Sequence, residues 1–102
     1  MNIKSDYSPY EDTLKIRVAG KFTHALHTEF THAYKSLPPS NRRKHIIDLS
    51  ATEYMDSSAL GMLLILRERA GGEQAQITLY GAANEVKKIL DISGFDKLFT
   101  FA

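Results

Sequence analysis

Apolar and polar side chains alternate in short segments of the chain, and this spacing is typical of strands. Leu14, Ile16 and Val18 alternate with Lys15 and Arg17, which is the two-residue period of a half-buried strand. A short apolar run led by β-branched residues predicts a central strand at 46–49. Further strands are expected at residues 77–80, around Ile3 and Tyr7, and around Leu98, Phe99 and Phe101.

Other segments repeat their apolar residues at the spacing of one helical face. From residue 26 the apolar positions recur at offsets of 4, 7, 8 and 11, which predicts a helix that Thr23 caps and Pro38 ends. Residues 56–70 are rich in Leu, Ala, Met, Arg and Glu, and Gly71 follows them, so a second helix is expected there. A third helix, ending near Gly94, is predicted by Val86, Ile89 and Leu90.

The predicted elements follow the order β-β-α-β-α-β-α-β. Strands that alternate with helices imply a mainly parallel sheet covered by helices. The opening hairpin adds an antiparallel pair, which makes the sheet mixed. We therefore expect one α/β domain over residues 1–102, with about four or five strands and about three main helices.

The length, charge and composition of the chain exclude several classes of function. The 102 residues suit a single domain, and the net charge of +1 argues against nucleic-acid binding by counterion release. The absence of Cys excludes disulfides, a thiol nucleophile and a zinc–thiolate site. The longest apolar run, at 62–66, is too short to span a membrane, and residues 1–6 show no signal-peptide apolar region. We expect a small cytoplasmic domain that does not insert into membranes.

Candidate chemistry lies at the carboxyl ends of the predicted parallel strands, where open α/β sheets form their sites. The loops at these ends are 19–23, 50–56 and 81–84. The middle loop leads into Asp56, Ser57 and Ser58. Asp56 suits a helix cap, and the two serines then lie beside the unpaired N–H groups and the positive end of the helix dipole. A phosphate on Ser57 would be electrostatically favoured there.

The residues alone leave alternatives open. The Asp-Ser-Ser segment also fits an ordinary helix cap, although Gly61 inside the same helix costs about 1 kcal/mol relative to Ala and favours a special site. A serine nucleophile lacks a Gly-x-Ser-x-Gly or Ser-x-x-Lys motif. His24 and His27 lack a third metal ligand at helical spacing, and Asp56 lacks the acidic cluster that an aspartyl phosphate needs. We expect no catalytic residue, metal or cofactor.

Residues 46–50 (Ile-Ile-Asp-Leu-Ser) and 55–64 (Met-Asp-Ser-Ser-Ala-Leu-Gly-Met-Leu-Leu) resemble the signature of STAS domains, and most of all that of bacterial anti-sigma factor antagonists. The similarity extends over nearly the whole chain, from the early strand that ends at Gly20 to the final helix. It implies a non-enzymatic switch in which a serine kinase, usually the anti-sigma factor itself, phosphorylates Ser57. The unphosphorylated form binds the anti-sigma factor, and a metal-dependent serine phosphatase resets it. Ala59 is a departure, since many relatives carry Gly there.

The resulting hypothesis assigns Ser57 as phosphoacceptor, supported by Asp56 and Ser58. Partner binding is assigned to Thr23, Glu53, Tyr54, Met62 and Gly81, although the position of Met62 also fits helix packing. The expected partners are an anti-sigma factor or serine protein kinase and a serine phosphatase, with no nucleic acid, and the chain is expected to be a monomer or weak dimer. The alternative is a constitutive STAS scaffold subunit of a membrane transporter complex. The regulated sigma factor and the identity of the kinase stay open.

Overall fold

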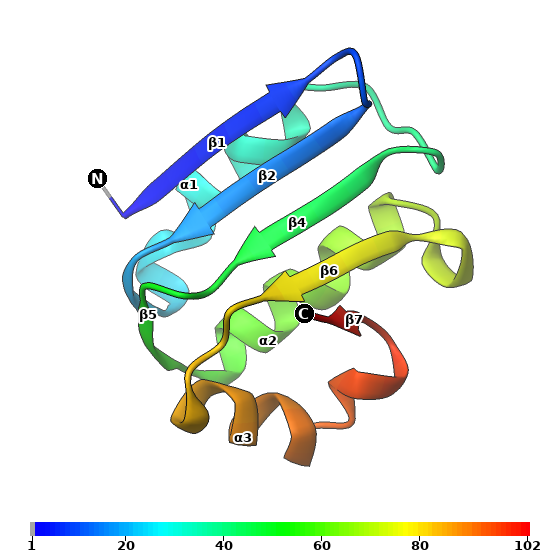
Figure 1. The fold of residues 1–102 in the computed structure, drawn as a ribbon. Helices are drawn as coiled ribbons and strands as arrows, with labels where there is room; N and C mark the ends of the chain where they lie inside the picture. The colour runs from blue at the N-terminus through cyan, green and yellow to red at the C-terminus, as the bar shows by residue number, and fades with distance from the viewer. Residues whose placement is uncertain (1) are drawn as a thin grey trace.

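Five strands form a mixed sheet in the computed structural model, which describes residues 2–102 (Figure 1). The strand order is β1-β2-β4-β6-β7, in which β1 is antiparallel to β2 and the other neighbours are parallel. The expected α/β fold with a mixed, mainly parallel sheet is confirmed. The strands are β1 (Ile3–Ser8), β2 (Thr13–Val18), β4 (Lys44–Asp48), β6 (Gln76–Tyr80) and β7 (Thr100–Phe101).

Helices cover one face of this sheet. Figure 1 shows α1 and α2 behind the strands and α3 along the lower border. The opposite face is turned toward the viewer, and no helix from residues 2–102 lies over it. No helix in these residues is long and apolar enough to cross a membrane. The helices are α1 (His27–Lys35), α2 (Ser57–Arg69) and α3 (Asn84–Ile92), and short 3-10 turns form η1 (His24–Leu26), η2 (Gly72–Gln74) and η3 (Phe95–Lys97).

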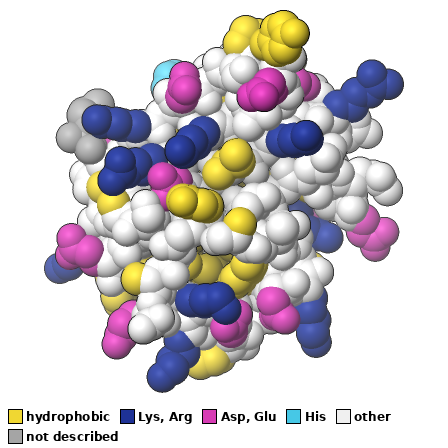
Figure 2. Space-filling model, in the orientation of Figure 1, with side chains coloured by type: hydrophobic (Ala, Val, Ile, Leu, Met, Phe, Trp, Pro, Cys, Tyr) yellow, Lys and Arg dark blue, Asp and Glu magenta, His cyan; other side chains and the backbone are white. Residues whose placement is uncertain are grey.

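The alternation of side chains along the strands determines which face is covered. The strand register places Leu14, Ile16 and Ile47 under the helices, where all three are buried. Lys15 and Arg17 lie on the other face and are exposed. Figure 2 shows charged side chains of both signs spread over that face. A shift of one residue would move these charges into the core, so burial fixes the register.

The core lies between the sheet and the helices, and α1, α2 and α3 all contribute buried side chains to it. The Phe30 ring of α1 lies 5.1 Å from the ring of Phe22 and 5.8 Å from that of Tyr34, measured between centroids. Because the buried side chains of α2 recur at the spacing of one helical face, their burial fixes the position of the amino end of α2. These side chains are Ala59, Met62, Leu63 and Leu66.

Two short strands lie where the sequence predicts only loops. β3 (Gly20–Phe22) and β5 (Thr52–Met55) pair in parallel and form a separate two-stranded ribbon. The buried Thr52 hydroxyl donates a hydrogen bond to the Val18 carbonyl at 2.7 Å, which joins this ribbon to the main sheet. The prediction was wrong here because β5 is buried only at its two ends and does not alternate.

Some predicted boundaries also shift. Thr23 caps the short turn η1, and α1 itself begins directly after that turn, at His27. The first helix ends at Lys35, before the proline that was expected to end it. Leu98 and Phe99 precede the last strand, which consists only of Thr100–Phe101. These differences leave the order of the main elements as predicted.

Candidate functional site

Asp56 caps helix α2 at the carboxyl edge of the sheet, defined here as the edge where β2, β4 and β6 end. Its backbone is extended, with φ of −105°, and its Oδ1 accepts a hydrogen bond from the Ala59 N–H at 2.9 Å. An extended backbone and a carboxylate acceptor are the requirements of a helix N-cap. The predicted capping role of Asp56 is therefore confirmed.

The same carboxylate connects α2 to the loop that follows β3. Its Oδ2 accepts a hydrogen bond from the His24 N–H at 3.4 Å, and the Asp56 N–H donates to the Phe22 carbonyl at 3.3 Å. Thr23 lies between these two partners, and its hydroxyl oxygen accepts from the Ala25 N–H at 3.3 Å. The pairing of β3 with β5 thus brings the Thr23 loop to the amino end of α2, as the parallel order of the strands predicted.

Ser57 is the first residue of α2 and is exposed, whereas Ser58 is partly buried. The first N–H groups of a helix have no acceptor within it, and the helix dipole adds positive potential at the same place. An exposed hydroxyl at this position is accessible to another protein and lies in a favourable field for an anion. The geometry is therefore compatible with a phosphoacceptor at Ser57.

The β5 strand before the cap presents two of the expected partner-binding residues. Glu53 and Tyr54 are both exposed, and 50% of the Tyr54 surface is accessible. Tyr54 is paired with Lys21 in the β3–β5 ladder. The ribbon therefore fixes the backbone of these residues while their side chains stay available beside the α2 amino end.

Two other expected partner-binding residues, Met62 and Gly81, lie outside β5. Met62 is only 3% exposed and belongs to the core, so its assignment to a binding surface was wrong. It faces inward because it lies on the buried side of α2. Gly81 has φ of +72°, and a Cβ at this position would lie 2.9 Å from the Ser50 Cβ. Gly81 therefore packs on the turn after β4, and its place in a surface shared with Ser57 stays a prediction.

Asp48 stabilises that turn from the end of β4. Its Oδ1 accepts hydrogen bonds from the Ser50 N–H at 2.9 Å and from the Ser50 hydroxyl at 2.6 Å. Burial raises the pKa of Asp48, but these Ser50 hydrogen bonds, with smaller help from nearby Lys15 and Arg17, bring the pKa below its ordinary value. The role of Asp48 in this turn was not predicted, although Asp two residues before Ser is a recognisable turn signal.

A second set of polar residues lies at the amino edge of the sheet, where the parallel strands begin. Tyr7, Asp12, Arg43 and His45 form what we call the amino-edge cluster. Arg43 Nε donates to Asp12 Oδ1 at 3.0 Å, and the Tyr7 hydroxyl donates to the same oxygen at 2.8 Å. These hydrogen bonds, that of Arg43 first, lower the pKa of Asp12. Burial and then the charge of Arg43 lower the pKa of His45 to about 4, so its imidazole is neutral at physiological pH.

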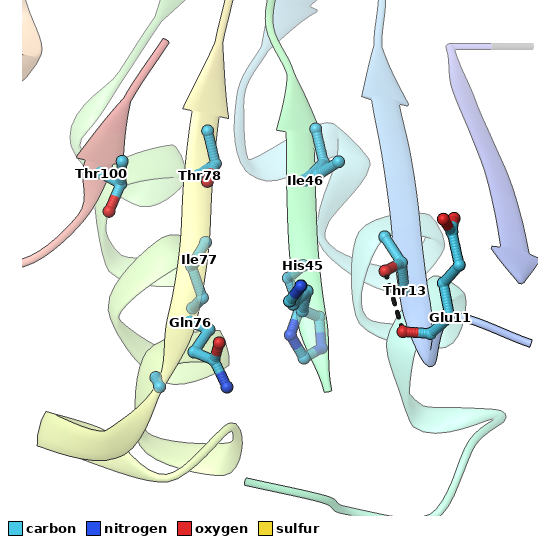
Figure 3. Close-up of a pocket in the computed structure, with 10 residues that line it drawn as sticks. Glu11, Thr13, His45, Ile46, Gln76, Ile77, Thr78 and Thr100 are labelled. Atoms are coloured by element: carbon cyan, nitrogen blue, oxygen red, sulfur yellow. Dashed lines mark hydrogen bonds between the residues drawn. The ribbon is translucent and has the colours of Figure 1, made fainter. Parts of the chain in front are cut away.

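A hollow of about 710 Å³ also lies at this amino edge. Figure 3 shows it between the beginnings of the parallel strands, with His45 and Gln76 near its lower end. The Thr13 hydroxyl donates to the Glu11 carbonyl at 3.3 Å on its border. The hollow is at the far end of the strands from Ser57, so it is separate from the candidate site.

The functional groups at the amino end of α2 are hydroxyls, a carboxylate and backbone N–H groups. His24 and His27 are exposed neighbours whose ring centroids are 5.7 Å apart. Within residues 2–102, His, Asp and Glu form no group of three that could hold a metal ion. The arrangement is suited to accepting a modification or contacting another protein surface.

Comparisons with known sequences agree with this geometry. A family model described as "Mlab, STAS domain" matches residues 6–100. The chain is 49% identical over 86 residues to STAS-domain containing protein PA14_20770 of Pseudomonas aeruginosa (strain UCBPP-PA14). That alignment covers 84% of each of the two chains.

Solved structures show the same fold. The anti-sigma factor antagonist SpoIIAA in its unphosphorylated form is similar with a TM-score of 0.72 and 18% identity, covering 98% of this chain and 87% of that chain. A sulfate transporter family protein from Wolinella succinogenes is similar with a TM-score of 0.69 and 12% identity, covering 94% of this chain and 80% of that chain. At such low identity these likenesses establish the SpoIIAA-like fold and no more.

Proposed function

The chain belongs to the STAS domain family, and from this premise we propose that it is a phosphoregulated interaction module that acts as an anti-sigma factor antagonist. Its unmodified form binds an anti-sigma factor that is also, or works with, a serine kinase. Phosphorylation of Ser57 releases that partner, and a serine phosphatase restores binding. The main support for this proposal is the exposed position of Ser57, which directly follows the Asp56 cap. It lies at the amino end of a helix that is held in place by its buried side chains.

The switch acts through charge in the contact surface. A phosphate brings a charge of about −1.5 to −2 at neutral pH, and it would lie next to the Asp56 carboxylate. Burying such an anion against a partner costs desolvation free energy and adds repulsion from any acidic partner group. A difference of ~3 kcal/mol between the two states corresponds to about 150-fold in affinity. One modified hydroxyl is therefore sufficient for regulation.

The fold itself tolerates the modification. The positive end of the α2 dipole offsets part of the added charge. Asp56 keeps both of its hydrogen bonds, because they are made to the Ala59 and His24 N–H groups rather than to Ser57. Ser58 supports the first turn. The phosphate therefore alters the surface that a partner meets while the sheet and helices keep their arrangement, and the protein needs no catalytic residue of its own.

Affinity purification with two variants tests this proposal. Tagged Ser57→Ala and Ser57→Asp proteins are produced in the source cells, and the proteins they retain are identified by mass spectrometry. The proposal predicts a kinase-fold regulator that Ser57→Ala retains and Ser57→Asp loses. Ser36→Asp is the matched control, since it adds the same charge at an exposed serine after α1, at the opposite edge of the sheet. Equal retention by Ser57→Ala and Ser57→Asp would contradict the switch.

A second candidate function rests on the likeness to the sulfate transporter family protein. In this alternative the chain is a constitutive scaffold subunit of a membrane transporter complex, and Asp56 is only a helix cap. It predicts that the same purification recovers a transporter subunit with the Ser57→Ala and Ser57→Asp proteins alike. The exposed serine favours the first proposal, because a helix cap requires Asp56 but not a hydroxyl at Ser57.

A further inference from the structure

The outward side of α2 forms a stripe that begins at Ser57. Positions 57, 61, 64 and 68 are three or four residues apart, so they lie on one side of the helix. Among them, 39% of Leu64 is exposed, and the adjacent Ile65 is 55% exposed. The buried residues Ala59, Met62, Leu63 and Leu66 lie on the other side, against the sheet.

This stripe departs from the ordinary pattern of a surface helix. Such a helix buries an apolar stripe and presents polar residues to solvent, whereas a helix that is apolar all round is normally buried. In α2 only the two ends of the stripe, Ser57 and Glu68, are polar, and Gly61, Leu64 and Ile65 lie between them. Two adjacent large aliphatic side chains on the solvent side indicate a surface that is covered in another state of the protein.

Gly61 gives independent support. Glycine is a poorer helix former than alanine, so glycine inside a helix normally reflects a close approach of another group. A Cβ built at Gly61 has no heavy atom within 4 Å apart from its own surroundings in the helix. The internal packing of this chain therefore does not require glycine, and the space above Gly61 is open to a group from outside.

We propose that the stripe formed by Ser57, Gly61, Leu64 and Ile65 docks an amphipathic helix of the partner that responds to Ser57. The proposal deepens the proposed function and rests on it. Gly61 forms a notch between larger side chains, which lets a second helix approach the α2 backbone closely. The apolar side of that helix covers Leu64 and Ile65 and carries the affinity, while its end lies against Ser57 and senses the phosphate.

The position of Ser57 favours this occupant over a second copy of the chain. A stable dimer through the stripe would cover Ser57 and shield it from a kinase, whereas a regulated partner leaves it uncovered in the free state. The stripe is also narrow. Stable interfaces bury about 800 Å² on each partner, so the partner surface must continue onto neighbouring residues, and the exposed Tyr54 before the cap is available for this.

Substitution of Gly61 separates binding from stability. Gly61→Ala should raise the thermal unfolding midpoint by a few degrees, because alanine favours the helix and nothing in the chain opposes its methyl group. The same methyl group should weaken partner binding by about tenfold or more, because it fills the notch. A more stable protein with unchanged affinity would overturn the proposed close approach.

The closing experiment compares retention of the kinase-fold regulator by five tagged proteins: wild type, Ser57→Asp, Leu64→Asp, Ile65→Asp and Ile92→Asp. Ile92 is the matched control, since it is an aliphatic residue of α3 that is 80% exposed. The proposal predicts a loss of about tenfold to a hundredfold for Leu64→Asp and Ile65→Asp, with retention by Ile92→Asp. Circular dichroism of each variant confirms that it is folded.

The outcomes distinguish the two proposals. Loss with Ser57→Asp alone would overturn the stripe and leave the switch intact. Loss with the stripe variants but not with Ser57→Asp would overturn the switch and the identity of the occupant. Recovery of an untagged second copy by wild type, abolished by Ile65→Asp, would overturn the stripe as a partner surface in favour of a dimer.

Discussion

The two edges of the sheet use their polar residues in different ways. At the amino edge, Arg43 is buried and its Nε and Nη1 donate to Asp12 and to the Pro38 carbonyl at 3.0 and 2.8 Å. At the carboxyl edge, Asp56 holds the Thr23 loop to the amino end of α2 while the adjacent Ser57 is exposed. Polar groups that satisfy one another inside the chain stabilise the fold. An exposed hydroxyl on a rigid support is instead available to other molecules.

This contrast predicts that substitutions divide by edge. Those at the amino edge should change the free energy of unfolding and leave partner binding intact. Those at Ser57 should change binding and leave stability nearly intact. Substitutions of Asp56 should change both stability and binding, because Asp56 caps a helix beside the exposed serine.

The largest expected effect is that of Arg43→Met. It leaves the Pro38 carbonyl without its donor and removes the cationic partner of Asp12, whose carboxylate can instead be hydrated because 38% of its side chain is exposed. The free energy of unfolding should therefore fall by about 1–3 kcal/mol, mainly through the lost donor. Urea denaturation followed by circular dichroism measures this change. Arg42→Met is the control, since its side chain is exposed and the change should stay within about 0.5 kcal/mol. Equal effects of the two substitutions would remove the distinction between the edges.

A pH titration of stability tests the same edge through His45. Its pKa is lowered from 6.5 to about 4 in the folded chain, by burial and by Arg43. Between these values the unfolded chain binds a proton that the folded chain does not, so stability should be complete above about pH 6.5 and should fall as the pH decreases toward 4. In His45→Gln this part of the pH dependence should disappear, whereas His32→Gln, at an exposed position, should keep it. A persistent slope in His45→Gln would assign it to other groups.

Asp56→Ala should cost about 1 kcal/mol of stability, which is the usual value of a lost helix cap. It also removes the acceptor for the His24 N–H, so hydrogen exchange at His24 and Ala59 should accelerate. Asp56→Asn keeps a side-chain acceptor and should retain most of the stability. If alanine and asparagine were equivalent in both measurements, the Asp56 side chain would not be what holds the Thr23 loop to α2.

Ser57→Ala is expected to have the smallest effect on stability, within about 0.5 kcal/mol. The side chain is exposed, and the cap hydrogen bonds are made by Asp56. Urea denaturation checks this value, and Ser58→Ala provides a comparison at a partly buried serine. A loss above 1 kcal/mol at Ser57 would show that this hydroxyl serves the fold, against the division of roles between the edges.

The sequence was sufficient for the main elements of the fold because their periodicity is strong. The alternation at 14–18 and the Asp56 cap each depend on local chemistry, and both are as predicted. The β3–β5 ribbon was missed because its pairing joins residues about thirty positions apart and its strands are too short to show a period. No local sequence pattern predicts such a long-range pairing.

The site was predictable only in part, for a related reason. The positions of Asp56, Ser57 and Thr23 around the amino end of α2 were predicted because caps and loops have local signals. Met62 was wrongly placed on a binding surface, and the exposure of Leu64 and Ile65 was not foreseen, because a helix that is apolar on all sides does not indicate which side faces the core. The Arg43–Asp12 pair spans 31 positions and likewise required the fold.

Phosphopeptide mapping of the protein, purified from its own cells with phosphatases inhibited, tests the Ser57 switch most directly. We expect phosphate on Ser57, in a fraction that changes with growth condition. Phosphate on Asp56, found under mild handling that preserves acyl phosphates, would contradict it and indicate a receiver-like mechanism. The absence of phosphate under all growth conditions tested would also contradict it, and Asp56-Ser57-Ser58 would then be only the cap of a constitutive scaffold.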